Sequence, residues 1–178
     1  MVVSQPRTLL FPDEIIVRRS LAKVLRNGGF RITMDQCFSQ VIAQCAQLRA
    51  DEGTWILPDM QSAYHQLHQL GMAHSVEVWL DGVLVGGLYG VALGRGIFGE
   101  SMFSTVGNAS KVALVYLCRQ LSLWEFAFID CQFSTDHLRS MGGRLNVHAR
   151  IFDAIINRCD PCRTYWTLDN SSRLILLF

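Results

Sequence analysis

Apolar residues recur three to four positions apart in two stretches of the first half of the chain. One stretch starts at Asp35 and continues until the sequence DEGTWILP interrupts it, and the other covers residues 59–70. This spacing places the apolar side chains on one face of a helix. It predicts two helices, the first capped by Thr33 or Asp35 and the second ending at Gly71.

Three shorter elements precede these helices. Residues 14–17 are predicted to form a short strand. The sequence RRSLAKVLRNGG indicates a helix that ends at Gly28 and Gly29, and FRITM indicates another strand.

The apolar period changes to two after residue 73. HSVEVWL, the turn Asp81-Gly82 and VLVGGLYGVAL predict a hairpin, and GIFGESMFS predicts a third strand. A long helix is expected to begin near Asn108 or Ser110. FAFIDCQF is typical of a buried strand, and two further helices are expected over residues 135–141 and 149–157.

The order of helix, helix, hairpin, strand, long helix, strand and helix predicts an α/β fold. It is the order of the acetyltransferase-like (GNAT) fold, in which helices flank a mixed central sheet, although other mixed folds share it. The sequence contains no repeat and no Pro/Gly linker, so we expect one domain over residues 1–178.

Composition narrows the class of protein. Half of the 178 residues are hydrophobic and 17% are charged, which excludes a disordered chain. No apolar run approaches the roughly 18 residues that a membrane span requires. The first residues lack the basic start and apolar core of a signal peptide. We therefore expect a cytoplasmic protein that does not associate with a membrane.

Six cysteines bear on redox and metal chemistry. We expect them to be free thiols, four of them in apolar segments. Cys159 and Cys162 form a C-x-x-C pair, but no second pair completes a zinc site and the pair follows an apparent helix instead of opening one. The sequence therefore gives no reason to expect a metal or another cofactor.

Positive charge is concentrated near the N-terminus although the net charge is only +1. Five cations lie in one short stretch that contains no acidic residue. Such a cluster is either a solvated helix face or a patch that contacts RNA phosphates without reading the sequence. The five are Arg18, Arg19, Lys23, Arg26 and Arg31.

Three polar side chains stand inside apolar strands. Glu100 interrupts GIFGESMFS, and Asp130 and Gln132 interrupt FAFIDCQF. A buried carboxylate is costly unless hydrogen bonds or charges satisfy it. Residues two apart in a strand share a face, so Asp130 and Gln132 are predicted to project together. They either fix the register of the strand or, with Glu100, line a polar cleft.

Seven segments in order resemble the leucyl/phenylalanyl-tRNA–protein transferase family. They are EGTWI, AYHQLHQLGMAHSVEVW, LVGGLYGVALG, GESMFS, NASKVAL, IDCQ and DHLRSMGG, between Glu52 and Gly143. The resemblance implies a bacterial cytoplasmic enzyme with a GNAT-like domain. Such enzymes move Leu, Phe or Met from aminoacyl-tRNA to the N-terminal Arg or Lys of a protein. The product is marked for degradation by the N-degron pathway.

The resemblance also implies site residues. Glu100, Asp130 and Gln132 match the family's GESMFS and DCQ motifs and are expected to be catalytic. Gln132 would orient the amine or the carbonyl, Asp130 would fix its rotamer, and Glu100 would contact the amine or the terminal ribose. Trp55 matches a residue near the terminal adenosine of the tRNA. The pocket for the apolar side chain would be lined by Leu88, Ile97, Met102, Leu114, Leu117 and Ile129.

The chain departs from the family pattern at both ends. The family's N-terminal domain is expected to be absent, with Phe11 and Pro12 resembling its final part. Asn146-Val147-His148 stands where the family tends to have Ile-Pro/Ser-Arg, and residues 159–178 match nothing in the family pattern. These departures leave open transfer to a small molecule, or an inactive homologue that binds RNA or a protein.

Two other enzyme classes fit less well. An acetyl-CoA acyltransferase would carry a Q/R-x-x-G-x-G/A loop before the long helix, where this chain has STVGNASKVA. A metal hydrolase could use His65, His68 and His74, but exposed or aromatic-stacked histidines explain their spacing more simply. Because the chain lacks the loop typical of acetyl-CoA acyltransferases, we expect that acetyl-CoA is not a substrate.

Overall fold

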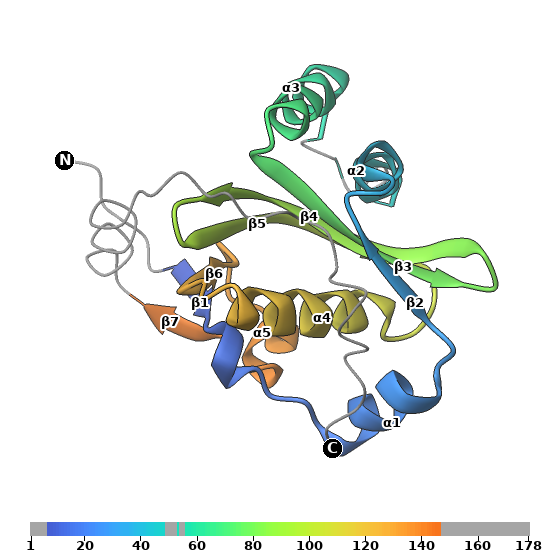
Figure 1. Cartoon of the computed structure of the whole chain (residues 1–178), viewed down its shortest axis with the longest axis vertical. Helices are drawn as coiled ribbons and strands as arrows, with labels where there is room; N and C mark the ends of the chain where they lie inside the picture. Colours follow the sequence, from blue (N-terminus) through green and yellow to red (C-terminus); the bar gives the residue numbers. More distant parts are fainter. Residues whose placement is uncertain (1–6, 49–52, 54–55, 147–178) are drawn as a thin grey trace.

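The computed structural model describes residues 7–48, 53 and 56–146. Within them, seven strands form one mixed sheet in the order β2-β3-β4-β5-β6-β1-β7 (Figure 1). β5 and β6 are parallel, and the other neighbouring pairs are antiparallel. The strands are β1 (Arg7–Leu10), β2 (Arg31–Met34), β3 (Ala73–Leu80), β4 (Val83–Leu93), β5 (Gly96–Ser104), β6 (Phe128–Asp130) and β7 (Arg144–Asn146).

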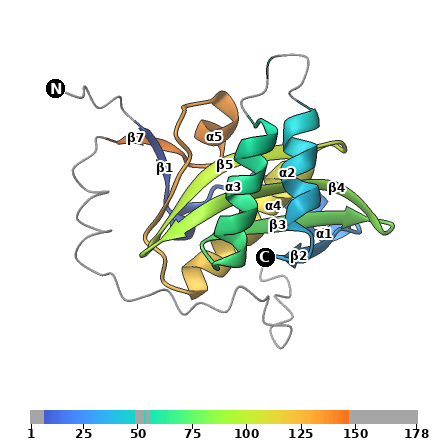
Figure 2. The ribbon, with the colours of Figure 1, turned by 90° about the horizontal axis from the view of Figure 1, so that it is seen from above.

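Helices cover both faces of this sheet. α2 and α3 lie side by side on one face, and α4 crosses the other face, on the same side as α1 and α5 (Figures 1 and 2). A short 3-10 turn, η1 (Pro12–Glu14), follows β1. The helices are α1 (Arg19–Asn27), α2 (Phe38–Gln47), α3 (Pro58–Gln69), α4 (Ala109–Leu123) and α5 (Asp136–Ser140).

The two largest apolar cores of the described residues correspond to the two layers of helices. The larger one joins the α4 side of the sheet to α4, and includes Val76, Leu88 and Leu114. The smaller one joins the opposite face to α2 and α3, and includes Val41 and Tyr89. β3 and β4 supply side chains to both cores, as expected for strands that are covered on both faces.

Most predicted elements are confirmed, and so is the α/β fold with a mixed sheet flanked by helices. The hairpin, β2, β5 and the helices α1 to α5 all lie where periodicity predicts them, within a few residues. None of the helices in the described ranges is both long enough and apolar enough to cross a bilayer. The helix predicted over 149–157, together with Cys159 and Cys162, lies outside the described residues.

Two local predictions are wrong, and two short strands were not predicted. Residues 14–17 form no strand. Glu14 ends η1, where its N–H donates to the Phe11 carbonyl at 3.0 Å, and the Ile16 N–H donates to the Met141 carbonyl at 3.0 Å. Ile15 and Val17 pack on the larger core. Neither Thr33 nor Asp35 caps α2, because Asp35 instead accepts a hydrogen bond from the Ser75 N–H at 2.8 Å. Nor did periodicity indicate β1 and β7, whose four- and three-residue lengths are too short for a periodic signal.

Candidate functional site

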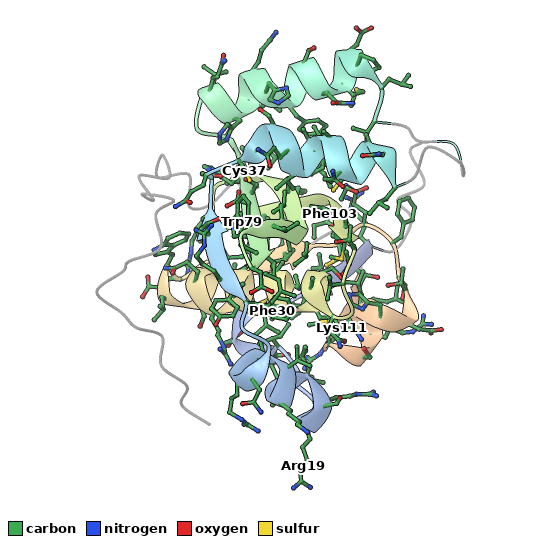
Figure 3. All side chains as sticks on the ribbon, turned by 90° about the vertical axis from the view of Figure 1, so that its right-hand side faces the viewer. Arg19, Phe30, Cys37, Trp79, Phe103 and Lys111 are labelled. Atoms are coloured by element: carbon green, nitrogen blue, oxygen red, sulfur yellow. The ribbon has the colours of Figure 1, made fainter. Side chains whose placement is uncertain are left out.

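Glu100 occupies a β-bulge of β5. Tyr89 of β4 pairs with Ser101 and Gly90 pairs with Gly99, so Glu100 has no residue opposite it. An inserted residue moves the side chains that follow it to the other face of the sheet. Ile97 accordingly packs on the α4 side, whereas Phe103 packs beneath α2 (Figure 3). The bulge is the reason that an apolar strand can carry a carboxylate near its centre.

The parallel strands β5 and β6 part close to this bulge. Their ladder has three residue pairs and ends with Phe98 opposite Asp130. Beyond that pair, no ladder hydrogen bonds join the two segments, and the Gln132 side chain links them instead. Its Nε2 atom lies 3.2 Å from the Gly99 carbonyl oxygen. The opening therefore lies between the end of β6 and the bulge of β5.

Gln132 lies in a tight turn and not in a strand. Its φ is +60°, in the left-handed region, and the Phe133 N–H donates to the Cys131 carbonyl at 2.7 Å. A hydrogen bond between residues two apart around a positive φ defines a γ-turn of the rare, strained kind. The prediction that Asp130 and Gln132 project from the same strand face is therefore wrong. Gln132 lines the cavity described below, and Asp130 does not.

Asp130 acts on the backbone of this turn. Its side chain is 1% exposed, and its Oδ1 accepts a hydrogen bond from the Gln132 N–H at 2.8 Å. The Arg7 Nε donates to its Oδ2 at 2.6 Å. The predicted contact between Asp130 and the Gln132 side chain is thus replaced by a contact to the Gln132 backbone.

Gln132 and Glu100 meet across the opening. The Gln132 Nε2 donates to the Glu100 Oε2 at 3.3 Å as well as to the Gly99 carbonyl. Both amide hydrogens therefore have acceptors, and the amide oxygen is the end available to accept a hydrogen bond from a substrate.

Tyr64 of α3 reaches the same carboxylate from the other layer. Burial, followed by the negative charge of Glu100 and a hydrogen bond to it, raises the pKa of Tyr64 above its usual value. The phenol therefore stays protonated at neutral pH and donates to Glu100. Sequence analysis missed Tyr64, because it is one of several aromatic and histidine positions along α3 and nothing in their spacing marks it.

A cavity of about 410 Å³ opens beside these groups. Its volume lies in the range of small-molecule sites. Glu100 and Gln132 stand on its wall, together with Thr135, His137 and Leu138 from α5 and the turn before it. Every residue predicted for the apolar pocket also lines it: Leu88, Ile97, Met102, Leu114, Leu117 and Ile129.

The other titratable groups of the cavity are neutral at pH 7. Burial and the neighbouring Asp130 charge raise the pKa of the Cys131 thiol to about 12. Burial, and then the charge of Lys111, lower the pKa of His137. His137 was not predicted as a site residue, because α5 is short and only the fold brings it against β5 and α4.

The five predicted phosphate-contacting cations lie apart from the cavity. All five side chains are exposed and none lines the cavity. Four belong to α1 or the residue before it, and Arg19 extends from α1 away from the sheet (Figure 3). Arg31 of β2 stacks on Trp79, with its guanidinium 5.0 Å from the ring centroid. Trp55 lies outside the described residues.

The histidines considered as metal ligands have other partners. A ring nitrogen of His74 lies 2.7 Å from Asp35, and His68 stacks on Phe38 with ring centroids 4.3 Å apart. Across residues 7–48, 53 and 56–146, no three His, Cys, Asp or Glu side chains are grouped to hold a metal ion.

Two solved structures of low sequence identity are similar to parts of this chain. A conserved protein of unknown function from Bacteroides thetaiotaomicron has a TM-score of 0.50 at 10% identity, over 76% of this chain and 53% of that one. A GCN5-related N-acetyltransferase from Kribbella flavida has a TM-score of 0.49 at 13% identity, over 81% of this chain and 55% of that one.

Sequence relatives are much closer. Proteins named leucyl/phenylalanyl-tRNA–protein transferase from Chromohalobacter salexigens and Stutzerimonas stutzeri are 59% and 52% identical to this chain. The matches cover 83% and 90% of this chain but only 58% and 72% of those proteins. A family model described as leucyl/phenylalanyl-tRNA protein transferase matches residues 9–159. The chain therefore belongs to the leucyl/phenylalanyl-tRNA protein transferase family.

Proposed function

We propose that this chain transfers Leu, Phe or Met from aminoacyl-tRNA to the N-terminal Arg or Lys of a protein. The observation that carries the proposal is an apolar cavity with one polar wall, where Gln132 and Glu100 are hydrogen-bonded to each other. The apolar side chain of the transferred residue fits the apolar part of such a cavity. Its ester carbonyl would then lie at the polar wall.

The reaction requires little general acid–base catalysis by the protein. The amine nitrogen of the acceptor attacks the ester carbonyl carbon, a C–N bond forms, and the C–O bond to the tRNA ribose breaks. The proton lost by the amine ends on the ribose oxygen. An α-amine has an ordinary pKa of about 7.7 to 8.0, so a useful fraction is neutral at pH 7. Positioning the substrates and stabilising the intermediate can lower the rest of the barrier.

Gln132 supplies the positioning in this scheme. Its amide hydrogens are engaged by Gly99 and Glu100, so its amide oxygen accepts a hydrogen bond from the attacking amine. Glu100 holds this amide and adds negative charge beside an acceptor amine that becomes positive as it attacks. A neutral amide is no strong base, and its role is orientation.

The exposed cations of α1 and β2 would contact tRNA phosphates. They lie outside the cavity, which suits contacts along an acceptor stem instead of at the reacting ester. The transferred residue would mark the acceptor protein for degradation by the N-degron pathway, in the cytoplasm. The proposed reaction requires no membrane, no cofactor and no acetyl-CoA.

The test is a transfer assay with purified protein, tRNA charged with labelled leucine, and a peptide that begins with Arg. We expect label on the peptide, and much less on a matched peptide that begins with Glu. Absence of label on the Arg peptide at high protein concentration would eliminate this activity. Label on a small molecule would instead assign the aminoacyl transfer to a different acceptor, and tRNA binding without transfer would indicate a binding protein.

A further inference from the structure

We propose that Arg7 is a positioning residue for the transfer reaction and acts through Asp130 on the turn that carries Gln132. The inference rests on the proposed function for its kinetic part. Arg7 does not line the cavity, so it has no direct access to the reacting atoms. Its effect must pass through the groups that it contacts.

The first step is the ion pair. The Arg7 side chain is 32% exposed, whereas its partner Asp130 is 1% exposed, with 2.6 Å between Nε and Oδ2. Burying a charged carboxylate to this degree is costly unless a counter-charge and hydrogen bonds satisfy it. Arg7 is the cation that contacts it within the described part of the chain, and a guanidinium keeps its charge at every working pH.

The second step is the hydrogen bond from the turn. Asp130 uses its other oxygen, Oδ1, to accept the Gln132 N–H at 2.8 Å. Each oxygen of this carboxylate thus has one partner, Arg7 on one side and the γ-turn on the other. Removing Arg7 would leave the buried Asp130 carboxylate without its counter-charge. Its remaining hydrogen bond would be the one from the Gln132 N–H, so any movement of the carboxylate would disturb the turn.

The third step is the template that β1 provides. Thr8, next to Arg7, accepts the Cys131 N–H at 2.8 Å and donates its own N–H to the Gln132 carbonyl at 3.3 Å. Leu9 pairs with Asp130. β1 therefore fixes residues 130–132 by backbone contacts while its Arg7 side chain fixes them by charge.

The turn requires this support because of its conformation. A non-glycine residue at φ +60° is strained and keeps that conformation only when its surroundings impose it. Without the turn, the strand alternation would place the Gln132 side chain on the Asp130 side, away from Glu100. Arg7 thereby determines where the Gln132 amide stands.

The kinetic test compares Arg7→Met and Arg7→Lys with Arg144→Met as the matched control. Arg144 of β7 pairs with Glu14 at the surface and does not line the cavity. For Arg7→Met we expect kcat to fall about 100-fold with KM for leucyl-tRNA changed less than about threefold, because a misplaced group affects the chemical step. Arg7→Lys should recover part of kcat, and Arg144→Met should match wild type. A kcat for Arg7→Met within about threefold of wild type would overturn the proposal.

A double variant separates action through Asp130 from a general loss of stability. Arg7→Met combined with Asp130→Asn removes both charges of the ion pair and should fold even if Arg7→Met alone does not. Its kcat should equal that of Asp130→Asn alone within about threefold, since neighbouring residues in one network are not additive. A further loss of about 100-fold on adding Arg7→Met would mean that Arg7 acts independently of Asp130.

A second readout does not depend on activity. In 1H–15N spectra, the Gln132 backbone amide should exchange slowly with solvent in wild type and in Arg144→Met, and rapidly in Arg7→Met. If wild type transfers no leucine, the proposed function fails, and this amide still decides whether Arg7 holds the turn. Slow exchange of the Gln132 amide in a folded Arg7→Met variant would refute the positioning role.

Discussion

Polar side chains from apolar segments come together at the cavity. Glu100 and Gln132 meet at 3.3 Å although they are 32 residues apart, and Asp130 supports Gln132 from behind. The cost of burying such groups made them visible in the sequence. The direction in which each one points depends on a bulge at Glu100 and on a positive φ at Gln132. Because the residue with positive φ is a glutamine and not a glycine, the sequence does not indicate the turn, and strand alternation predicted the wrong face for Gln132.

Replacing Gln132 tests its orienting role. We expect Gln132→Ala to lower kcat for leucyl transfer about 100- to 1,000-fold, as loss of one preorganised hydrogen-bonding group typically does. Gln132→Gly should lose as much, and glycine accepts φ +60° without strain, so the two variants together separate the amide from the backbone. Steady-state kinetics provide the measurement, and Gln47→Ala at the exposed end of α2 is the control. An unchanged rate in both Gln132 variants would remove this role.

Cys131 stands beside Gln132 on the cavity wall but should not act as a nucleophile. Its pKa of about 12 keeps the thiol protonated at pH 7 to 8, so almost no reactive thiolate is present. We expect Cys131→Ser to transfer leucine within about threefold of the wild-type rate. In both proteins the rate should rise towards pH 8 as the acceptor amine, whose ordinary pKa is about 7.7 to 8.0, loses its proton. A covalent aminoacyl adduct on the wild-type thiol, detected by mass spectrometry, would contradict this expectation.

Secondary-structure elements set the shape of the cavity in two ways. β5 parts from β6 after three residue pairs, and β1 lies between β6 and β7.

Of these strands, periodicity predicted β5, since nine residues of mostly apolar sequence between turns are enough for a signal. The position of β1 could not be predicted, because its four residues pair with strands that lie far along the chain: Leu9 faces both Asp130 and Arg144.

The bulge of β5 depends on a close approach at Gly90. A Cβ built there would lie 2.4 Å from the Phe98 carbonyl oxygen, so β4 and β5 would have to separate beside Glu100. We expect Gly90→Ala to lower the free energy of unfolding by about 1–3 kcal/mol, the usual cost of overpacking. It should also lower kcat, because Glu100 moves with the bulge. Urea unfolding and the transfer assay provide the measurements.

Gly107→Ala is the matched control for this variant. Gly107 has no heavy atom within 4 Å of a built Cβ and no positive φ. Its stability should remain within about 0.5 kcal/mol of wild type, as for most surface substitutions. If Gly90→Ala were as stable as Gly107→Ala, the close approach would not limit the spacing of the two strands.

In the described part of the chain, the apolar cavity and the exposed cations of α1 and β2 lie apart. A net charge of +1 gives no general attraction to RNA, but four cations on and beside α1 and Arg31 on β2 lie on the surface. The cavity is lined by residues of β4, β5, β6, α4 and α5 and of the turn between β6 and α5. This division suits a substrate with a long charged part and a short apolar end, as an aminoacyl-tRNA has.

Salt dependence tests the role of these cations. We expect binding of tRNA to weaken with rising salt, with a log–log slope that falls by roughly 0.7–0.9 for each phosphate contact removed. Arg19→Ala and Lys23→Ala should each weaken binding and reduce the slope, while kcat at saturating leucyl-tRNA stays unchanged. Arg144→Ala should alter neither quantity. Identical slopes in all the proteins, measured by filter binding, would assign α1 to a solvated face.

The amino-acid sequence determined most of the elements and the polar positions, because periodicity and the cost of buried charge are local properties that a linear chain displays. It also determined the apolar residues of the cavity, through their resemblance to a known family. The bulge that turns Glu100 to the cavity, the γ-turn at Gln132, and the contacts of Arg7 and Tyr64 followed only from the folded chain. These features depend on pairings between distant segments, and such pairings are settled by the packing of the sheet and its helices.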